Sequence, residues 1–142
     1  MSSRSAQRFV FHGALLFLLG LLTGFVVPGA TNPRMGLSAH LEGVMNGTFL
    51  LALGAVWSHV SLPARLETAA LWLLLYGAYV NWAAVLLGAL TGASRLMPIA
   101  GAGHTGPAWA EALVSFGLVS ISFAMVAGVA LVLWGVVRAR FR

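Results

Sequence analysis

Cysteine and lysine are both absent from this chain, and acidic residues are scarce. The lack of cysteine excludes disulfides, thiolate metal ligands and a cysteine nucleophile. All eight basic side chains are arginines, and the three acidic residues are Glu42, Glu67 and Glu111. Hydrophobic residues fill 60% of the 142 positions and charged residues only 8%, which indicates a membrane protein. The few charges lie at the ends of apolar segments, so the net charge of +5 does not indicate nucleic-acid binding.

Four apolar segments divide the chain, and each approaches the roughly 20 residues that cross a bilayer core. They cover about residues 9–27, 35–59, 66–90 and 109–137. A segment inside lipid must satisfy its own backbone, so each segment is predicted to be a helix. Asn32 suits the N-cap and Pro33 suits the first helical position, so the second helix could begin at Pro33 rather than at residue 35. The fold class is therefore an all-α, integral membrane four-helix bundle, with residues 1–142 forming a single transmembrane domain. The glycine-rich residues 91–107 are expected to form a surface loop that could act as a lid.

The arginines predict how the bundle is oriented. With four spans, both termini and the link between the second and third helices lie on one side of the membrane. That side carries six arginines and the other side two: Arg4, Arg8, Arg65, Arg138, Arg140 and Arg142 against Arg34 and Arg95. Because positive loops stay inside, both termini are predicted to be cytoplasmic.

The second segment carries polar residues on two different faces. Glu42 and Asn46 are four residues apart and therefore stack, whereas His40 lies about 120° or more away from both around the helix. Two opposed polar faces suit a cyclic oligomer, in which each face meets a different neighbouring subunit. We therefore expect a homo-oligomer, with a trimer as the specific prediction. Gly43 and Gly47 lie on the His40 side, where they either allow close helix packing or clear space for a flat ligand, and the two interpretations are compatible.

Helix geometry also predicts which polar groups meet inside the membrane. At 1.5 Å per residue, Asn46 lies roughly 20 Å along its helix, and Tyr76, Tyr79 and Asn81 lie roughly 14 to 21 Å from the outer end of theirs. These residues are therefore expected to form one layer, with the two tyrosines on a shared face and Asn81 pointing elsewhere. Polar groups at this depth are candidates for function because burying them without a role is costly.

His40 has two interpretations from the residues alone. It is either hydrogen-bonded to a neighbouring carbonyl or to Glu111, or it is an axial ligand of a haem through a neutral imidazole. The other histidines, His12, His59 and His104, lie near or beyond segment ends and supply no second ligand. A haem held by His40 would therefore keep an open position, which favours Lewis-acid chemistry over electron transfer.

Two stretches carry a resemblance to a known family. Residues 32–57, "NPRMGLSAHLEGVMNGTFLLALGAVW", and residues 72–89, "WLLLYGAYVNWAAVLLGA", closely resemble the hydroxylaminobenzene mutases of nitroaromatic-degrading bacteria. The chain more distantly resembles the styrene oxide isomerases, most clearly at His40 and Asn46, six residues apart. The resemblance implies a multi-pass isomerase of the bacterial cytoplasmic membrane that rearranges hydroxylaminobenzene to 2-aminophenol.

The resemblance to the isomerases also implies a cofactor and a site. It implies a homotrimer with ferric haem b between subunits, iron held by the histidine that matches His40, and an active-site asparagine that matches Asn46. The isomerases use a tyrosine and an aspartate of the third helix, where this chain has Tyr76 and Tyr79 but no aspartate. Glu67 and Asn81 are the nearest substitutes, and the missing aspartate places the mutase activity ahead of epoxide isomerisation.

The predicted site combines these groups around a small aromatic substrate that reaches it from the lipid. His40 is the predicted metal ligand, with Gly43 and Gly47 beside the cofactor. Tyr76 or Tyr79 is expected to donate a proton, while Asn46 and Asn81 orient the substrate. Three alternatives remain open: an epoxide-to-aldehyde isomerase, a small transport protein with Glu42, Glu111 and His40 as a proton relay, and a cytochrome-like anchor subunit.

Overall fold

The computed structural model describes residues 4–140, and every regular element within that range is helical. The elements, in chain order, are α1 (Arg4–Val26), η1 (Val27–Gly29), α2 (Pro33–Val56), η2 (Trp57–His59), α3 (Ala64–Thr91), α4 (Pro98–Gly101) and α5 (Ala108–Arg140). Four of these helices are long and apolar enough to cross a membrane, and they confirm that the four predicted apolar segments are helical, to within a few residues at each end. Arg142, part of the predicted positive side, lies outside the described residues.

The second helix begins where its capping residues predict. Asn32 has an extended backbone, and its side-chain oxygen accepts a hydrogen bond from the Met35 amide at 3.1 Å. Pro33 occupies the first helical position, where no amide proton is needed. The Asn32 side-chain amide also donates to the carbonyls of Ala100 and Gly101 at 3.1 and 3.0 Å. Asn32 therefore caps the start of α2 and also holds the α3–α5 connection against it.

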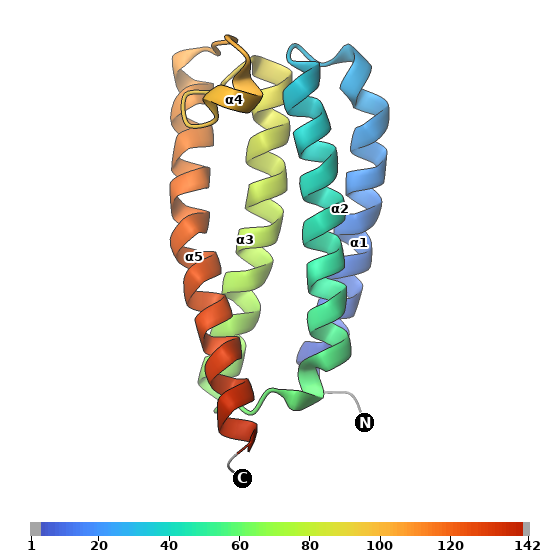
Figure 1. The fold of residues 1–142 in the computed structure, drawn as a ribbon, viewed down its shortest axis with the longest axis vertical. Coiled ribbons are helices and arrows are strands. Elements are labelled where there is room, and N and C mark those ends of the chain that lie inside the picture. The colour runs from blue at the N-terminus through green and yellow to red at the C-terminus, as the bar shows by residue number, and fades with distance from the viewer. Residues whose placement is uncertain (1–3, 141–142) are drawn as a thin grey trace.

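The long helices are arranged as an open row rather than as a closed square (Figure 1). Within the described residues, α1 packs mainly on α2, α2 on α3 and α3 on α5, and α1 also touches α3. Among the long helices, α5 contacts only α3. Both chain ends and the α2–α3 link lie at one end of the bundle along the helix axes, and the α3–α5 connection lies at the opposite end (Figure 1). One side of α2 and one side of α5 are thus left without a partner helix.

Glycine faces bring α1 and α2 together. A Cβ added to Gly43 would collide with the backbone of Gly20, and a Cβ on Gly47 would lie 2.5 Å from the amide nitrogen of Phe17. The predicted packing role of Gly43 and Gly47 is therefore confirmed. The other interpretation, in which they clear space for a flat ligand, is wrong for this chain because α1 itself fills that space. Such contacts allow van der Waals packing between helices that the lipid does not force together.

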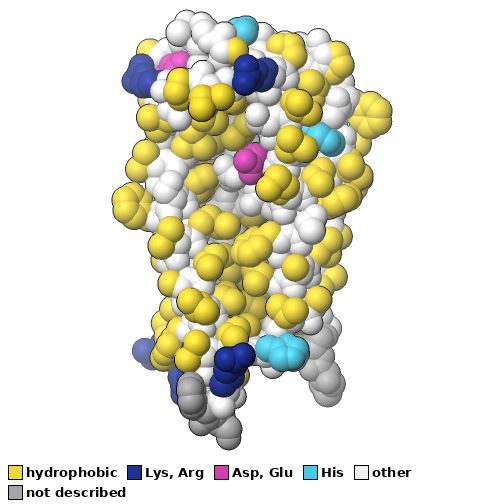
Figure 2. Space-filling view, in the orientation of Figure 1, with side chains coloured by type: hydrophobic (Ala, Val, Ile, Leu, Met, Phe, Trp, Pro, Cys, Tyr) yellow, Lys and Arg dark blue, Asp and Glu magenta, His cyan; other side chains and the backbone are white. Residues whose placement is uncertain are grey.

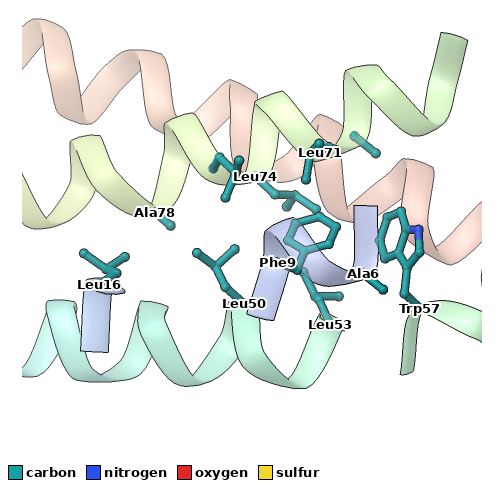
Figure 3. Packing of buried hydrophobic residues seen from close by; sticks show 11 residues of the cluster. Ala6, Phe9, Leu16, Leu50, Leu53, Trp57, Leu71, Leu74 and Ala78 are labelled. Carbon is teal, nitrogen blue, oxygen red and sulfur yellow. The ribbon is translucent and has the colours of Figure 1, made fainter. Parts of the chain in front are cut away.

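Large apolar side chains fill the bundle toward the end that carries the termini (Figure 3). Phe9 of α1 is fully buried and lies against Trp57, with ring centroids 4.6 Å apart. Leu50, Leu71 and Leu74 of α2 and α3 complete this cluster. Two smaller buried clusters, around Met35 and around Val114, continue the packing toward the other end of the bundle.

The α3–α5 connection is fixed by a buried carboxylate. Glu111, which is 5% exposed, accepts hydrogen bonds from the backbone amides of Ser94, Arg95 and Gly106 at 3.0 to 3.1 Å. The short helix α4 lies between these anchors. The expected partnership of Glu111 with His40 is therefore wrong, because this carboxylate is occupied by the loop.

Candidate active site

His40 lies on the α1 side of α2 and uses one ring nitrogen within the chain. Its Nδ1 donates to the carbonyl oxygen of Gly20 at 2.8 Å, as one of the two interpretations of this residue predicts. The ring lies over Gly24, where an added Cβ would be 3.2 Å from Nδ1. Gly24, rather than Gly43 or Gly47, therefore provides room for the imidazole. The repeated glycines of α1 were the signal for this role.

The other ring nitrogen of His40 is free to bind a ligand. Within the described residues Nε2 has no hydrogen-bond partner, and the side chain is partly exposed on the bundle surface. A hydrogen bond from Nδ1–H to a carbonyl fixes the tautomer that leaves Nε2 unprotonated, which is how protein histidines are prepared to bind metals. Residues 4–140 contain no group of three or more histidine, aspartate or glutamate side chains close enough to hold a metal ion. His40 could serve a cofactor that takes a single ligand from this chain.

The opposite polar face of α2 meets α3 in what we call the acid–amide layer, formed by Glu42, Asn46 and Asn81. The Asn46 side-chain amide donates to Glu42 Oε2 at 3.0 Å, and the Asn81 amide makes a short hydrogen bond to the same oxygen. The other oxygen, Glu42 Oε1, accepts no hydrogen bond within the described chain. The prediction that Glu42 and Asn46 stack, and that Asn46 shares a layer with Asn81, is confirmed.

The two tyrosines do not join this layer. Tyr76 is 41% exposed and its hydroxyl lies 2.7 Å from Ser120 Oγ of α5. Tyr79 faces α1, where its hydroxyl lies 3.1 Å from His12 Nδ1. The expectations that the tyrosines share a face and meet Asn46 are therefore wrong. The same holds for Glu67 as a substitute for the missing aspartate, because it accepts from Trp57 Nε1 at 3.3 Å near the other end of the bundle.

A groove opens beside the acid–amide layer, on the side where α2 and α5 have no contact. We call it the Asn81 groove. Its volume is about 470 Å³, and it is lined by Asn81, Leu96, Met97, Leu118, Val119, Ile121 and Ser122. A second hollow of about 380 Å³ shares Leu96 and Met97 and extends toward Arg34 and Ser38 at the outer end. Figure 2 shows an acidic side chain interrupting the hydrophobic surface partway along this face.

The hydrogen bonds within the acid–amide layer use its N–H donors and leave oxygen acceptors without partners among the described residues. Because the side-chain nitrogens of Asn46 and Asn81 point at Glu42, their carbonyl oxygens remain as acceptors without a partner in the described chain. Glu42 Oε1 is a third acceptor. Ser122 Oγ, which donates to the Leu118 carbonyl at 2.9 Å, lines the same groove. Of the acid–amide layer, Asn81 lines the groove, so a molecule there would meet mostly apolar side chains together with Asn81 and Ser122.

Comparison with known proteins shows that this membrane-type bundle is similar to known enzymes. The sequence model of the family described as styrene oxide isomerase matches residues 5–137. Hydroxylaminobenzene mutase HabB of Ectopseudomonas oleovorans is 53% identical over 131 residues, covering 92% of this chain and 80% of the relative. Hydroxylaminobenzene mutase HabA of the same organism is 44% identical over 134 residues, covering 93% of this chain and 99% of the relative. No solved structure gives a significant match.

These matches identify the class first: the chain is an enzyme, and its reaction is an isomerisation. It belongs to the styrene oxide isomerase family, and the resemblance to hydroxylaminobenzene mutases is confirmed over most of its length. The transporter and cytochrome-like alternatives are accordingly set aside.

Proposed function

We propose that this isomerase is an arylhydroxylamine mutase that converts hydroxylaminobenzene to 2-aminophenol. The observation that carries the proposal is the similarity to two relatives that are both named hydroxylaminobenzene mutases, each matching more than nine tenths of this chain. The reaction moves oxygen from nitrogen to the ortho carbon of the ring, with no net redox change and no added water.

The Asn81 groove supports this substrate class. Hydroxylaminobenzene is small, aromatic and neutral, so it partitions into the bilayer and can enter between α2 and α5. Apolar side chains such as Leu118 and Ile121 would contact its ring, and the carbonyl oxygen of Asn81 would accept its N–H or O–H. A pocket that excludes water also protects a cationic ring intermediate from attack by bulk water.

We also propose that His40 holds a haem b. The fit rests on the bare Nε2 at the bundle surface and on the Nδ1 hydrogen bond to Gly20 that fixes its tautomer. A ferric haem held there would supply a Lewis acid that polarises the N–O group of the substrate. The side chains of the protein would do the rest: the amides would orient the substrate, and the apolar groove walls would exclude water.

A homotrimer would bring the two parts of such a site together. His40 lies on the α1 side of α2, whereas the acid–amide layer and the Asn81 groove lie on its α3 side, so one chain does not contain both in one pocket. In a closed ring, the His40 face of one subunit meets the groove of the next. Native mass spectrometry of the detergent-solubilised enzyme should give a trimer. Fully active monomers would refute this assembly.

We further propose that the chain spans the bacterial inner membrane with both termini in the cytoplasm, as the arginine distribution favours. The absence of cysteine allows a direct test. Ser58→Cys at the α2–α3 end and His104→Cys in the outer loop place single exposed thiols at opposite ends. An impermeant maleimide applied to intact cells should label the His104→Cys variant only. The reverse pattern would invert the topology.

The substrate is tested by supplying membranes that contain the enzyme with hydroxylaminobenzene or with styrene oxide. We expect 2-aminophenol from the first, separated from 4-aminophenol and quantified by liquid chromatography. Membranes without the enzyme serve as the control. Styrene oxide converted to phenylacetaldehyde, with no aminophenol formed, would replace the mutase with the epoxide isomerase that the family description names.

A further inference from the structure

Glu42 is a carboxylate that forms no ion pair with any described residue. It lies within the α2 span, is partly exposed, and has the amides of Asn46 and Asn81 as its side-chain partners among residues 4–140. By contrast, Glu111 holds three loop amides and Glu67 accepts from Trp57. A carboxylate at membrane depth without a cationic partner is energetically unfavourable and marks a functional site.

The side-chain hydrogen bonds of this carboxylate fall on only one of its two oxygens. Both amides donate to Oε2, so they hold the group in one orientation, while Oε1 is without a partner in the described chain. Asn46 is only 9% exposed, which anchors the arrangement in the bundle. Asn81 bonds to Glu42 and also forms part of the groove wall, so Glu42 lies one residue away from the space in which a substrate fits.

The proposed reaction needs such a group. When oxygen has moved from nitrogen to the ortho carbon, that carbon still carries its hydrogen and the ring is not aromatic. Restoring aromaticity requires removal of this proton, and the nitrogen must gain one. The ortho carbon and the nitrogen are both bonded to the same ring carbon, so a single carboxylate can take the proton from one and return it to the other.

We propose that Glu42 is the catalytic base and then acid of this step, an inference that rests on the proposed mutase function. Its Oε1 takes the ortho proton, the electron pair of the C–H bond restores the ring, and the C=N π pair moves to nitrogen. The protonated Glu42 then delivers the same proton to nitrogen and returns to its starting state. No oxidant, reductant or water is consumed, and Asn46 and Asn81 act as positioning residues for the carboxylate.

Glu42→Gln tests the step because it preserves shape while removing the base. We expect kcat to fall by about 10²–10⁴-fold, the usual contribution of a positioned acid or base. Glu67→Gln is the matched control, since its oxygen can still accept from Trp57 outside the site, and it should keep wild-type kcat. Size-exclusion profiles and thermal unfolding in detergent establish that both variants fold. Glu42→Asp should restore part of the activity.

A kinetic isotope effect separates proton transfer from a structural role. With hydroxylaminobenzene deuterated at both ortho positions, Glu42→Gln should show a larger isotope effect on kcat than the wild type, because ring deprotonation becomes slow. Wild-type kcat in this variant, or a lower kcat with an unchanged isotope effect, would overturn the proposal. If wild-type membranes form no 2-aminophenol, the proposed function fails and this step fails with it; an active wild type with an unaffected variant refutes the step alone.

Discussion

The two faces of α2 use polar and small residues in opposite ways. Toward α1, glycines at 43 and 47 bring the backbones into contact, and the only long polar side chain there, His40, lies at the edge over Gly24. Toward α3, Glu42 accepts one hydrogen bond from Asn46 within α2 and one from Asn81 across the interface. The first face is closed to any ligand between the helices, whereas the second adjoins a groove.

This difference indicates how a small bundle accommodates a site at little cost to stability. Close glycine contacts hold α1 and α2 as a rigid pair by van der Waals packing, so the pair does not depend on polar groups. The polar groups of the other face are then available for chemistry. Substitutions on the two faces should therefore separate effects on the cofactor, on turnover and on folding.

The largest effect is expected for His40→Ala, which removes the bare Nε2. The variant should lose haem and activity together, because no other described histidine lies within the outer half of a span. The measurement is haem content by absorption spectroscopy after purification, alongside turnover. His59→Ala is the matched control, since His59 is exposed at the α2–α3 link and should keep the wild-type spectrum. A Soret band that survives in His40→Ala would refute haem ligation by this residue.

The next largest effect is expected for the amides of the acid–amide layer. Asn46→Ala and Asn81→Ala should each lower kcat by about 10²–10³-fold, as for the loss of one oriented polar group in an active site. Haem content should stay unchanged because neither side chain is the proposed iron ligand. Thr48→Ala, which removes only a hydroxyl bonded to its own helix at Val44, is the control. Wild-type turnover in both asparagine variants would show that the layer is structural.

A smaller effect, on stability, is expected for the glycine face. Gly43→Ala would force a methyl group against the backbone of Gly20, which cannot move aside as a flexible side chain does. Overpacking of this kind lowers the free energy of unfolding by about 1–3 kcal/mol. Gly29→Ala is the control, because an added Cβ there meets nothing within 4 Å. Thermal unfolding in detergent measures both, and equal stability would contradict the tight α1–α2 contact.

The smallest effect is expected for the tyrosines. Tyr79→Phe removes the hydroxyl that meets His12, and Tyr76→Phe the one that meets Ser120, so each should lose about 1 kcal/mol of stability or less. Turnover should stay close to wild type, because neither hydroxyl bonds to the acid–amide layer. A loss of kcat of tenfold or more in either variant would return that tyrosine to the role of proton donor that the sequence predicts.

Hydropathy was sufficient to predict the four spans, because a backbone in lipid has few alternatives to a helix. The capping role of Asn32 was also predictable, since it depends on neighbouring residues alone. The partners of Tyr76 and Tyr79 were not predictable, because a helical wheel gives directions around one helix but not which neighbour lies in each direction. In the open row, those directions lead to α5 for Tyr76 and to α1 for Tyr79.

Within the candidate site, the Glu42–Asn46 spacing predicted one shared face, and helix depth predicted the level of Asn81. The glycines show the limit of such patterns. The spacing of Gly43 and Gly47 indicates close approach, but only the position of α1 shows that a helix, and not a ligand, occupies the space.

Among the long helices α5 contacts only α3, and this affects the order in which the bundle can assemble. During synthesis α1 and α2 emerge first, and their glycine contacts are complete without any later segment. This hairpin can therefore assemble in the membrane before α5 has left the ribosome, and α3 then adds the acid–amide layer. Because α5 arrives last and contacts only α3 among the long helices, the wall that it forms beside Asn81 is the final part of the groove to be built.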